Sequence, residues 1–160
     1  MKCKITGNNI NTFMTFGRMP IANGFVNKEN FNKEYFFEME VGFNEDLSLF
    51  QLNDHPKPEK MFNENYPFFS GSSEFMKDHF KEYANFVKKS YLNSNSKIVE
   101  IGSNDGTFLK NFTDNKKNII GFEPSNNVAE IAKNNQIPIV NEFFNTENVS
   151  KLKKFLGNTD

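Results

Sequence analysis

Alternating apolar and polar residues mark the first 70 positions of the chain. Within residues 34–43, Phe37, Met39 and Val41 face one way and the glutamates between them face the other. This alternation is typical of a half-buried strand. Turn-forming Asn, Gly and Pro residues separate that segment from two shorter β-like runs, at 12–17 and 47–52. The pattern predicts a small β-rich module over residues 1–70.

The apolar period changes after this module. From 71 to 92, apolar residues recur every three or four positions behind a serine pair that can cap a helix. From residue 93 onward, strand-like and helical segments alternate, which favours parallel strands joined by helices. The expected strands are 97–101, 118–123 and 137–140. The predicted fold class is therefore α/β: a β-rich module (1–70), a linking helix (71–92) and a partial doubly wound, Rossmann-like sheet (93–160).

One edge of that sheet is expected to be open. Strand 97–101 can pair with 118–123, and the latter with the third strand, but no further strand remains for the other edge of 97–101. Its residues Ile98, Val99 and Ile101 are those of an interior strand. We therefore expect self-association at micromolar concentration, or a C-terminal segment that completes the sheet.

Composition and charge narrow the classes of partner. The chain has 160 residues and a formal net charge of −1, which gives no electrostatic footprint for nucleic acid or an anionic membrane. No apolar run is long enough to cross a bilayer. The N-terminus lacks the apolar core of a signal peptide, which predicts a cytoplasmic protein. The single cysteine, Cys3, excludes an internal disulfide.

The stretch "KIVEIGSNDGTFLKNF", residues 97–112, carries the candidate chemistry. A strand that ends at Gly102, with Gly106 opening the next helix, lets a ligand approach the backbone and meet helix N–H groups. A dinucleotide site needs G-x-G-x-x-G, but Asn104 and Thr107 occupy the second and third glycine positions. A nicotinamide cofactor is therefore disfavoured.

S-adenosylmethionine fits the same stretch better. Its site tolerates E-x-G-x-x-x-G, and the following strand ends at an acid that can accept both ribose hydroxyls. An ordinary α/β domain with a strand-end acid and a helix-cap acid is the alternative. The cofactor-binding residues that we predict are Glu100, Gly102, Ser103, Asn104, Asp105, Gly106, Glu123 and Pro124.

Several segments resemble one family. They are "VEIGSNDGTFLKNF", "GFEPSNNVAEIA", "MPIANGF", "LSLFQL" and "ENYPFFSGSSEFMKDHFKEYA". Together they resemble the nucleotide-sugar C-methyltransferases, class I S-adenosylmethionine-dependent enzymes that methylate deoxysugars. The resemblance implies a small-molecule nucleotide sugar as substrate. It also implies that the catalytic base lies beyond residue 160, so that this chain alone is a truncated form that binds cofactor without turnover.

Members of that family carry a zinc module with two C-x-x-C pairs. The corresponding positions here are Cys3, Thr6, Asn44 and Leu47, one cysteine of four. Because structural zinc needs a full set of Cys or His ligands, we expect no metal. We expect a phenylalanine-rich core to replace it, built from Phe13, Phe16, Phe25, Phe36, Phe37 and Phe50.

The remaining candidates lie around the linking helix. His79 shares a face with Phe75 and is either a core or interface histidine or a low-ranking catalytic candidate. In the preceding loop, Tyr66, Ser70 and Ser73 could line the cofactor or sugar site, or only cap the helix. For the whole chain, two alternative functions stay open: a different nucleotide-binding α/β protein, or a non-catalytic module that a partner completes.

Overall fold

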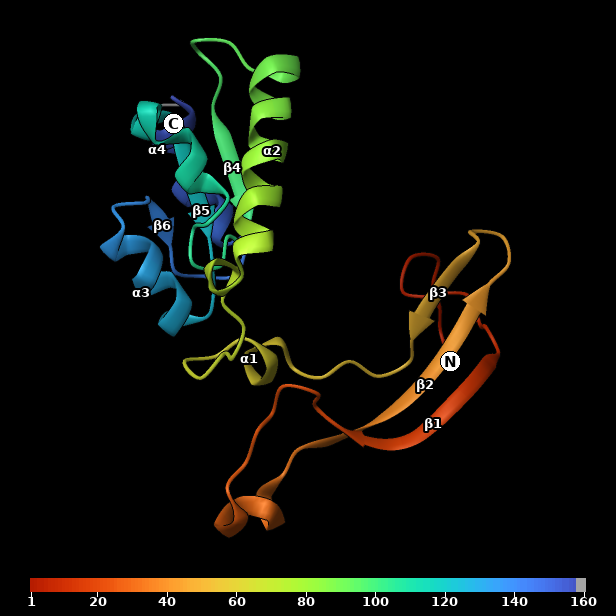
Figure 1. The fold of residues 1–160 in the computed structure, drawn as a ribbon. Coiled ribbons are helices and arrows are strands. Elements are labelled where there is room, and N and C mark those ends of the chain that lie inside the picture. The colour runs from red at the N-terminus through yellow and green to blue at the C-terminus, as the bar shows by residue number, and fades with distance from the viewer. Residues whose placement is uncertain (158–160) are drawn as a thin grey trace. The chain divides into compact units, whose positions relative to one another are not determined.

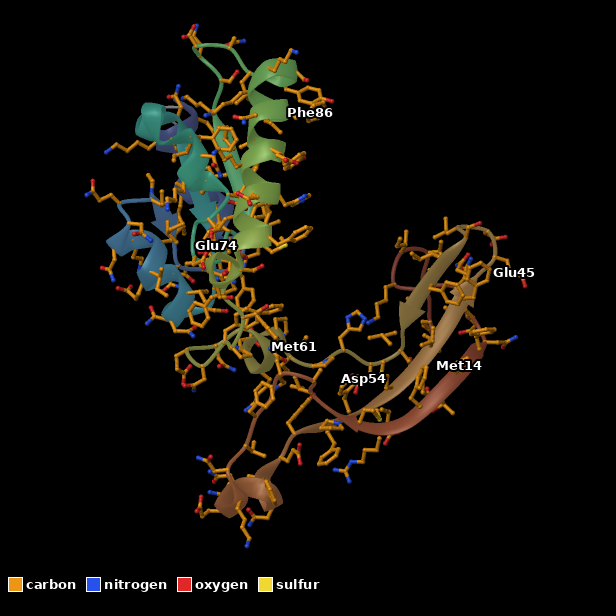
Figure 2. The ribbon with its side chains drawn as sticks, viewed as in Figure 1. Met14, Glu45, Asp54, Met61, Glu74 and Phe86 are labelled. Atoms are coloured by element: carbon orange, nitrogen blue, oxygen red, sulfur yellow. The ribbon has the colours of Figure 1, made fainter. Side chains whose placement is uncertain are left out.

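The computed structural model describes residues 1–157, without the side chains of 113–117 (Figure 1). The chain forms two compact units, Met1–Met61 and Phe62–Asp160. The division follows Met61, which Figure 2 labels, so the loop before the long helix groups with the second unit. None of the described helices combines the length and apolar character needed to cross a membrane.

The first unit is built on an antiparallel sheet in the order β1-β2-β3. All three strands were expected from the sequence. The unit also contains two short helices. One connects the first two strands, and the other follows the third strand. The elements are β1 (Thr12–Pro20), η1 (Lys28–Lys33), β2 (Phe36–Asn44), β3 (Leu49–Leu52) and α1 (Pro58–Met61).

The expected phenylalanine core of this unit is wrong. Phe13, Phe16, Phe25 and Phe50 are all more than half exposed, and Phe36 is also exposed. A three-stranded sheet needs a second layer to bury a face, and this unit offers only two helices of six and four residues. Phe13 and Phe50 contact each other edge to face, at 5.7 Å between ring centroids. The buried side chains of the unit are instead Cys3, Ile21 and Asn44.

The second unit contains a parallel sheet in the order β4-β5-β6. As expected, β4 pairs with β5 and β5 with β6, and among the described residues no strand pairs with the other edge of β4. The segment after β4 is a 3-10 helix that begins later than the predicted helix. The elements are β4 (Ile98–Ile101), η3 (Leu109–Asn118), β5 (Ile119–Phe122), α3 (Asn126–Asn134), β6 (Ile139–Val140), η4 (Asn148–Leu152) and α4 (Lys153–Leu156).

The long helix α2 (Glu74–Tyr91) runs beside β4 (Figure 1). The short turn η2 (Ser70–Ser72) precedes it, and Ser73 caps it by accepting the N–H of Met76 at 3.3 Å. Its inner face joins one apolar cluster from four elements and a loop: Ala84, Leu109, Phe112, Ile119, Ala132 and Ile137. Phe86 lies on its outer face and is 53% exposed (Figure 2).

We predict that Gly106→Ala destabilises the second unit by about 1–3 kcal/mol more than Gly102→Ala. Both glycines have positive φ, +77° and +71°, so both substitutions carry the same backbone strain. A Cβ at Gly106 would lie 3.1 Å from both Ala132 and Ile137, whereas a Cβ at Gly102 meets nothing within 4 Å. Chemical denaturation measures the difference, and equal losses would contradict the expected clash.

Candidate cofactor site

Two turns meet at the carboxyl ends of β4 and β5. The N–H groups of Gly102 and Ser103 both donate to the carbonyl of Phe122, at 2.8 and 3.0 Å, which fixes the turn after β4 against the end of β5. Gly102 has a φ of +71°, and the space where its Cβ would stand is empty. The backbone at Gly102 is therefore open to a ligand.

A cavity of about 280 Å³ lies at these strand ends. Its volume is just below the range of roughly 300–1,000 Å³ that is usual for small-molecule pockets. It brings together five residues expected from the sequence. These are Tyr66, Gly102, Asn104, Glu123 and Pro124.

Aromatic side chains that the sequence analysis did not single out form the rest of this cavity. Phe62 contacts Tyr66 and Phe143, with ring centroids 5.7 and 6.4 Å apart. Phe143 and Phe144 follow closely after β6, so they also lie past the carboxyl end of a parallel strand. That shared position is the signal that could have identified them. The remaining lining residues are Ile101 and Phe122.

Glu123 is a buried acid that joins the two turns. Its Oε2 accepts the N–H of Asn104 at 2.9 Å, and its Oε1 accepts the N–H of Ser125 at 2.8 Å. The residue is 5% exposed and lines the cavity. Because a carboxylate oxygen can accept more than one hydrogen bond, each oxygen retains capacity for a ligand hydroxyl.

The neighbouring residues of the turn hold the loop that precedes α2. Asp105 accepts the N–H of Gly71 at 2.7 Å through Oδ2, and the N–H and hydroxyl of Thr107 through Oδ1. Asn104 accepts the N–H of Ser70 at 2.9 Å and donates to the carbonyl of Phe68 at 3.0 Å. These bonds give Asp105 a structural role and tie the loop to the turn after β4.

The other predicted residues lie outside the 280 Å³ cavity. Gly106 abuts Ala132, and Asp105 and Gly106 line a separate cavity of about 330 Å³. Ser103 is buried over Gly121, and Ser73 is the helix cap. His79 is exposed, so it is not a core histidine, and its roles at an interface or in catalysis stay predictions.

Glu100 is the least satisfied acid of the site. Its Oε2 is buried without a hydrogen-bond partner. Burial and, to a smaller extent, the nearby carboxylates of Asp105 and Glu123 together raise the pKa of Glu100 to about 8. The side chain is therefore mostly protonated at neutral pH, and a cation placed nearby would favour its ionised form.

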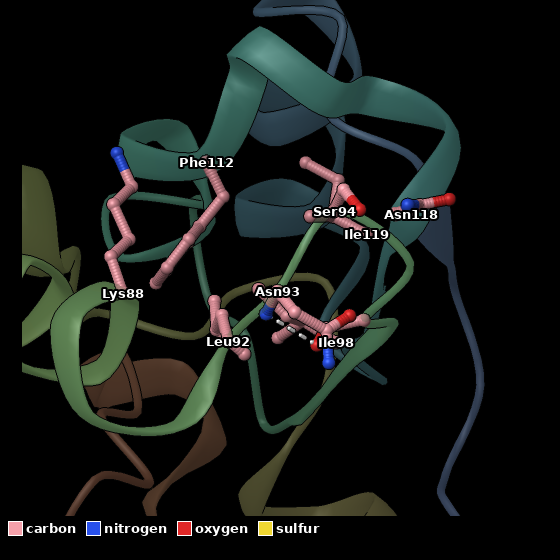
Figure 3. Close-up of a pocket in the computed structure, with 9 residues that line it drawn as sticks. Lys88, Leu92, Asn93, Ser94, Ile98, Phe112, Asn118 and Ile119 are labelled. Carbon is pink, nitrogen blue, oxygen red and sulfur yellow. Dashed lines mark hydrogen bonds between the residues drawn. The ribbon is translucent and has the colours of Figure 1, made fainter.

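A third cavity, of about 290 Å³, lies at the opposite end of the same strands (Figure 3). Ile98 and Ile119, the first residues of β4 and β5, line it together with Leu92, Phe112 and the aliphatic stem of Lys88. None of the predicted site residues is among its lining residues. Ligands of open parallel sheets bind at the carboxyl ends of strands, which favours the cavity beside Gly102.

Comparison with known families gives one match. Residues 3–62 match the methyltransferase-associated family model Methyltransf_13, described as "Putative zinc binding domain". The match covers the N-terminal module and identifies it as a methyltransferase-related one. No curated protein is similar enough to this chain to be matched.

The residues of this module do not fit zinc. The positions that the resemblance assigns to ligands hold a thiol, a hydroxyl, a carboxamide and a hydrocarbon, in Cys3, Thr6, Asn44 and Leu47. Among the described residues, no group of three or more His, Cys, Asp or Glu side chains could hold a metal ion. The Thr6 hydroxyl, with the backbone of Thr6 and Ile5 and the Asn44 side chain, lowers the pKa of the Cys3 thiol to about 7.

We predict that Glu100 makes stability fall with rising pH. Its pKa is about 8 in the folded chain against the usual 4.5, so the folded state holds the extra proton between these values. The free energy of unfolding should therefore decrease from about pH 4.5 to about pH 8, by at most about 1.4 kcal/mol per pH unit from this group, and level off above. Denaturant unfolding at pH 5 to 9 measures this.

The Glu100→Gln variant isolates the contribution of that carboxyl. It should lack the decline and should be more stable than the wild type near pH 8. Glu64→Gln, at an exposed glutamate, serves as the matched control and should keep the wild-type slope. Parallel pH profiles for the wild type and Glu100→Gln would contradict the raised pKa.

Proposed function

We propose that the second unit binds S-adenosylmethionine in the 280 Å³ cavity, as the cofactor part of a methyltransferase. The observation that carries this proposal is the meeting of the open backbone at Gly102 with the buried acid Glu123 in one cavity. A free backbone suits the methionine end of the cofactor, and an acid at the end of the next strand suits the ribose hydroxyls. The methyltransferase-related module at residues 3–62 supports the same assignment.

The charge around the cavity supports this cofactor over a dinucleotide. Glu100, Asp105 and Glu123 interact electrostatically, and no lysine or arginine lines the cavity among the described residues. A pyrophosphate would meet these acids without a compensating cation. S-adenosylmethionine carries a sulfonium and an ammonium group, both of which a negative environment attracts.

The aromatic lining supports an adenine-binding role for the outer part of the cavity. Phe62 is in ring contact with both Tyr66 and Phe143, and Phe144 contacts Phe122 at 5.1 Å between centroids. Flat aromatic faces stack on bases, and the aromatic surface of such pockets removes the base from water. Adenine is therefore the part of the cofactor that we assign to this aromatic wall.

The acceptor that we propose is a nucleotide-linked deoxysugar, methylated at carbon. This assignment comes from the resemblance of the chain to nucleotide-sugar C-methyltransferases. In that reaction a proton is removed beside a keto group, and the resulting carbanion takes the methyl group from the sulfonium. The contribution of the described residues is to bind and orient the cofactor for that transfer.

Calorimetry with S-adenosylhomocysteine, S-adenosylmethionine and NAD⁺ tests the cofactor assignment directly. We expect the full chain to bind the first two and not the third. Binding of NAD⁺ with comparable affinity would favour a different nucleotide-binding protein. Absence of binding by all three would favour the non-catalytic interpretation.

We predict that Gly102→Val abolishes S-adenosylhomocysteine binding, because the added side chain fills the space that the ligand occupies. Gly7→Val is a closely matched control. Gly7 has a φ of +74° against +71° at Gly102, and a Cβ at either position meets nothing within 4 Å. The control introduces the same backbone strain in the other unit and should bind as the wild type does. Equal affinities for the two variants would exclude the Gly102 turn as the site.

We predict that Glu123→Ala weakens S-adenosylhomocysteine binding by about 1.5–3 kcal/mol, the scale of hydrogen bonds to a charged group. Asp105→Ala controls for the structural loss, because it also removes a buried carboxylate that accepts two backbone N–H groups. Asp105 does not line the cavity, so its variant should lose less affinity. Calorimetry on both variants, with their melting temperatures measured alongside, decides the point. Equal losses would remove the ribose role from Glu123.

A further inference from the structure

Two turns of the first unit are each followed by a residue in the left-handed backbone conformation. Residues 3–6 are followed by Gly7, with a φ of +74°, and residues 44–47 are followed by Ser48, with a φ of +49°. A left-handed conformation is uncommon for a serine, so its recurrence at the equivalent position is informative. Each turn thus has two positions at C-x-x-C spacing and a left-handed residue directly after the second.

Within each turn, polar groups surround the side chain of the first residue. The Thr6 hydroxyl and the backbone of Thr6 and Ile5 lie close enough to the Cys3 thiol to lower its pKa. In the second turn, the Oδ1 of Asn44 accepts the N–H of Leu47 at 3.0 Å. The carboxamide oxygen of Asn44 therefore occupies, in its turn, the position that the sulfur occupies in the other.

The sheet brings the two turns together. Gln51 of β3 holds the chain on both sides of Cys3, since its Nε2 donates to the Lys2 carbonyl at 2.9 Å and its Oε1 accepts the Lys4 N–H at 3.0 Å. β3 also pairs with the end of β2, where Asn44 lies opposite Leu49. Figure 2 labels Glu45, which belongs to the turn between these strands.

The two turns approach each other at these first residues. The Asn44 side chain lies close enough to the Cys3 thiol to lower its pKa, and its Oδ1 accepts the Leu47 N–H, which leaves its Nδ2 to face the thiol. Cys3 and Asn44 are 2% and 4% exposed, so this polar contact is shielded from water. Leu47 occupies the fourth ligand position, and its side chain is 42% exposed. It takes part in the second turn through its backbone N–H, which bonds to Asn44.

We propose that these two turns are a metal-ligand scaffold in which a polar cluster of Cys3, Thr6 and Asn44 stands where zinc would bind. The scaffold keeps the spacing of four ligand positions and the left-handed residue after each turn, while three of the four positions carry side chains that do not bind zinc. The module is therefore held by polar contacts between the turns and needs no metal. Restoring the three thiols should restore the metal site.

The triple variant Thr6→Cys, Asn44→Cys, Leu47→Cys in the full chain tests the scaffold. We expect it to hold one zinc per chain by metal analysis, and to give with Co²⁺ the absorption bands of a tetrahedral thiolate site. The wild type should hold no stoichiometric zinc. Should the variant fold only with metal, addition of zinc should restore its circular dichroism and raise its melting temperature.

A second triple variant, Thr12→Cys, Asn27→Cys, Asn53→Cys, is the matched control. It adds three thiols to the same unit at positions outside the two turns. We expect the first variant to bind Co²⁺ on the order of a thousandfold more tightly than this control. Equal binding by the two variants would overturn the scaffold, and so would wild-type protein purified with one zinc per chain.

The polar cluster has its own test, which adds no thiol. Asn44→Leu removes both the acceptor for the Leu47 N–H and the polar contact with Cys3, and should lower the melting temperature of the first unit. Asn27→Leu, at an exposed position, should leave it unchanged. Identical melting temperatures for the two variants would show that Asn44 does not hold the turns together.

Discussion

The second unit depends on one buried carboxylate placed between two backbone segments. Glu123 accepts N–H groups from Asn104, past the end of β4, and from Ser125, before α3. These are the donors that a turn and a helix start would otherwise leave unpaired, and leaving buried N–H groups unpaired is costly. The same acid therefore fastens the turn after β4 to the start of α3 and forms one wall of the cavity. By holding the backbone of Asn104, it also positions the asparagine side chain that binds the loop at 68–70.

The acidic side chains of the site repel one another when ionised, as long as no cation is present. Glu123 and Asp105 each have backbone donors, so their charges are compensated locally. Glu100 has no such donor at its Oε2 and takes up a proton instead, as the raised pKa indicates. Burying an acid in this way reduces stability and is typical of positions that serve a ligand. A positively charged cofactor would relieve this repulsion, which links the electrostatics of the free protein to the proposed chemistry.

Local periodicity predicted the elements well and the contacts between them poorly. The alternation before Asn44 gave β2, and the three- and four-residue period gave α2 with its Ser73 cap. The phenylalanine core failed because alternation shows that a face is apolar but not whether a second layer covers it. Gly106 matched the cofactor spacing, yet its environment is Ala132, which only the packing of α3 could reveal. Likewise, the roles of Asn104 and Asp105 rest on bonds that span 34 residues, beyond any local pattern.

The hydrogen bonds of Gln51 to the backbone of Lys2 and Lys4 affect the order in which the first unit folds. Its two bonds span 49 and 47 residues, most of the first unit. The turns at Cys3 and between β2 and β3 are both local and can close early, whereas the docking of the Cys3 turn on β3 must wait until β3 presents Gln51. A slow, late step that buries the Cys3 thiol is therefore built into the topology of the unit. Until that step is complete, a nascent or refolding chain exposes a thiol that the finished fold conceals.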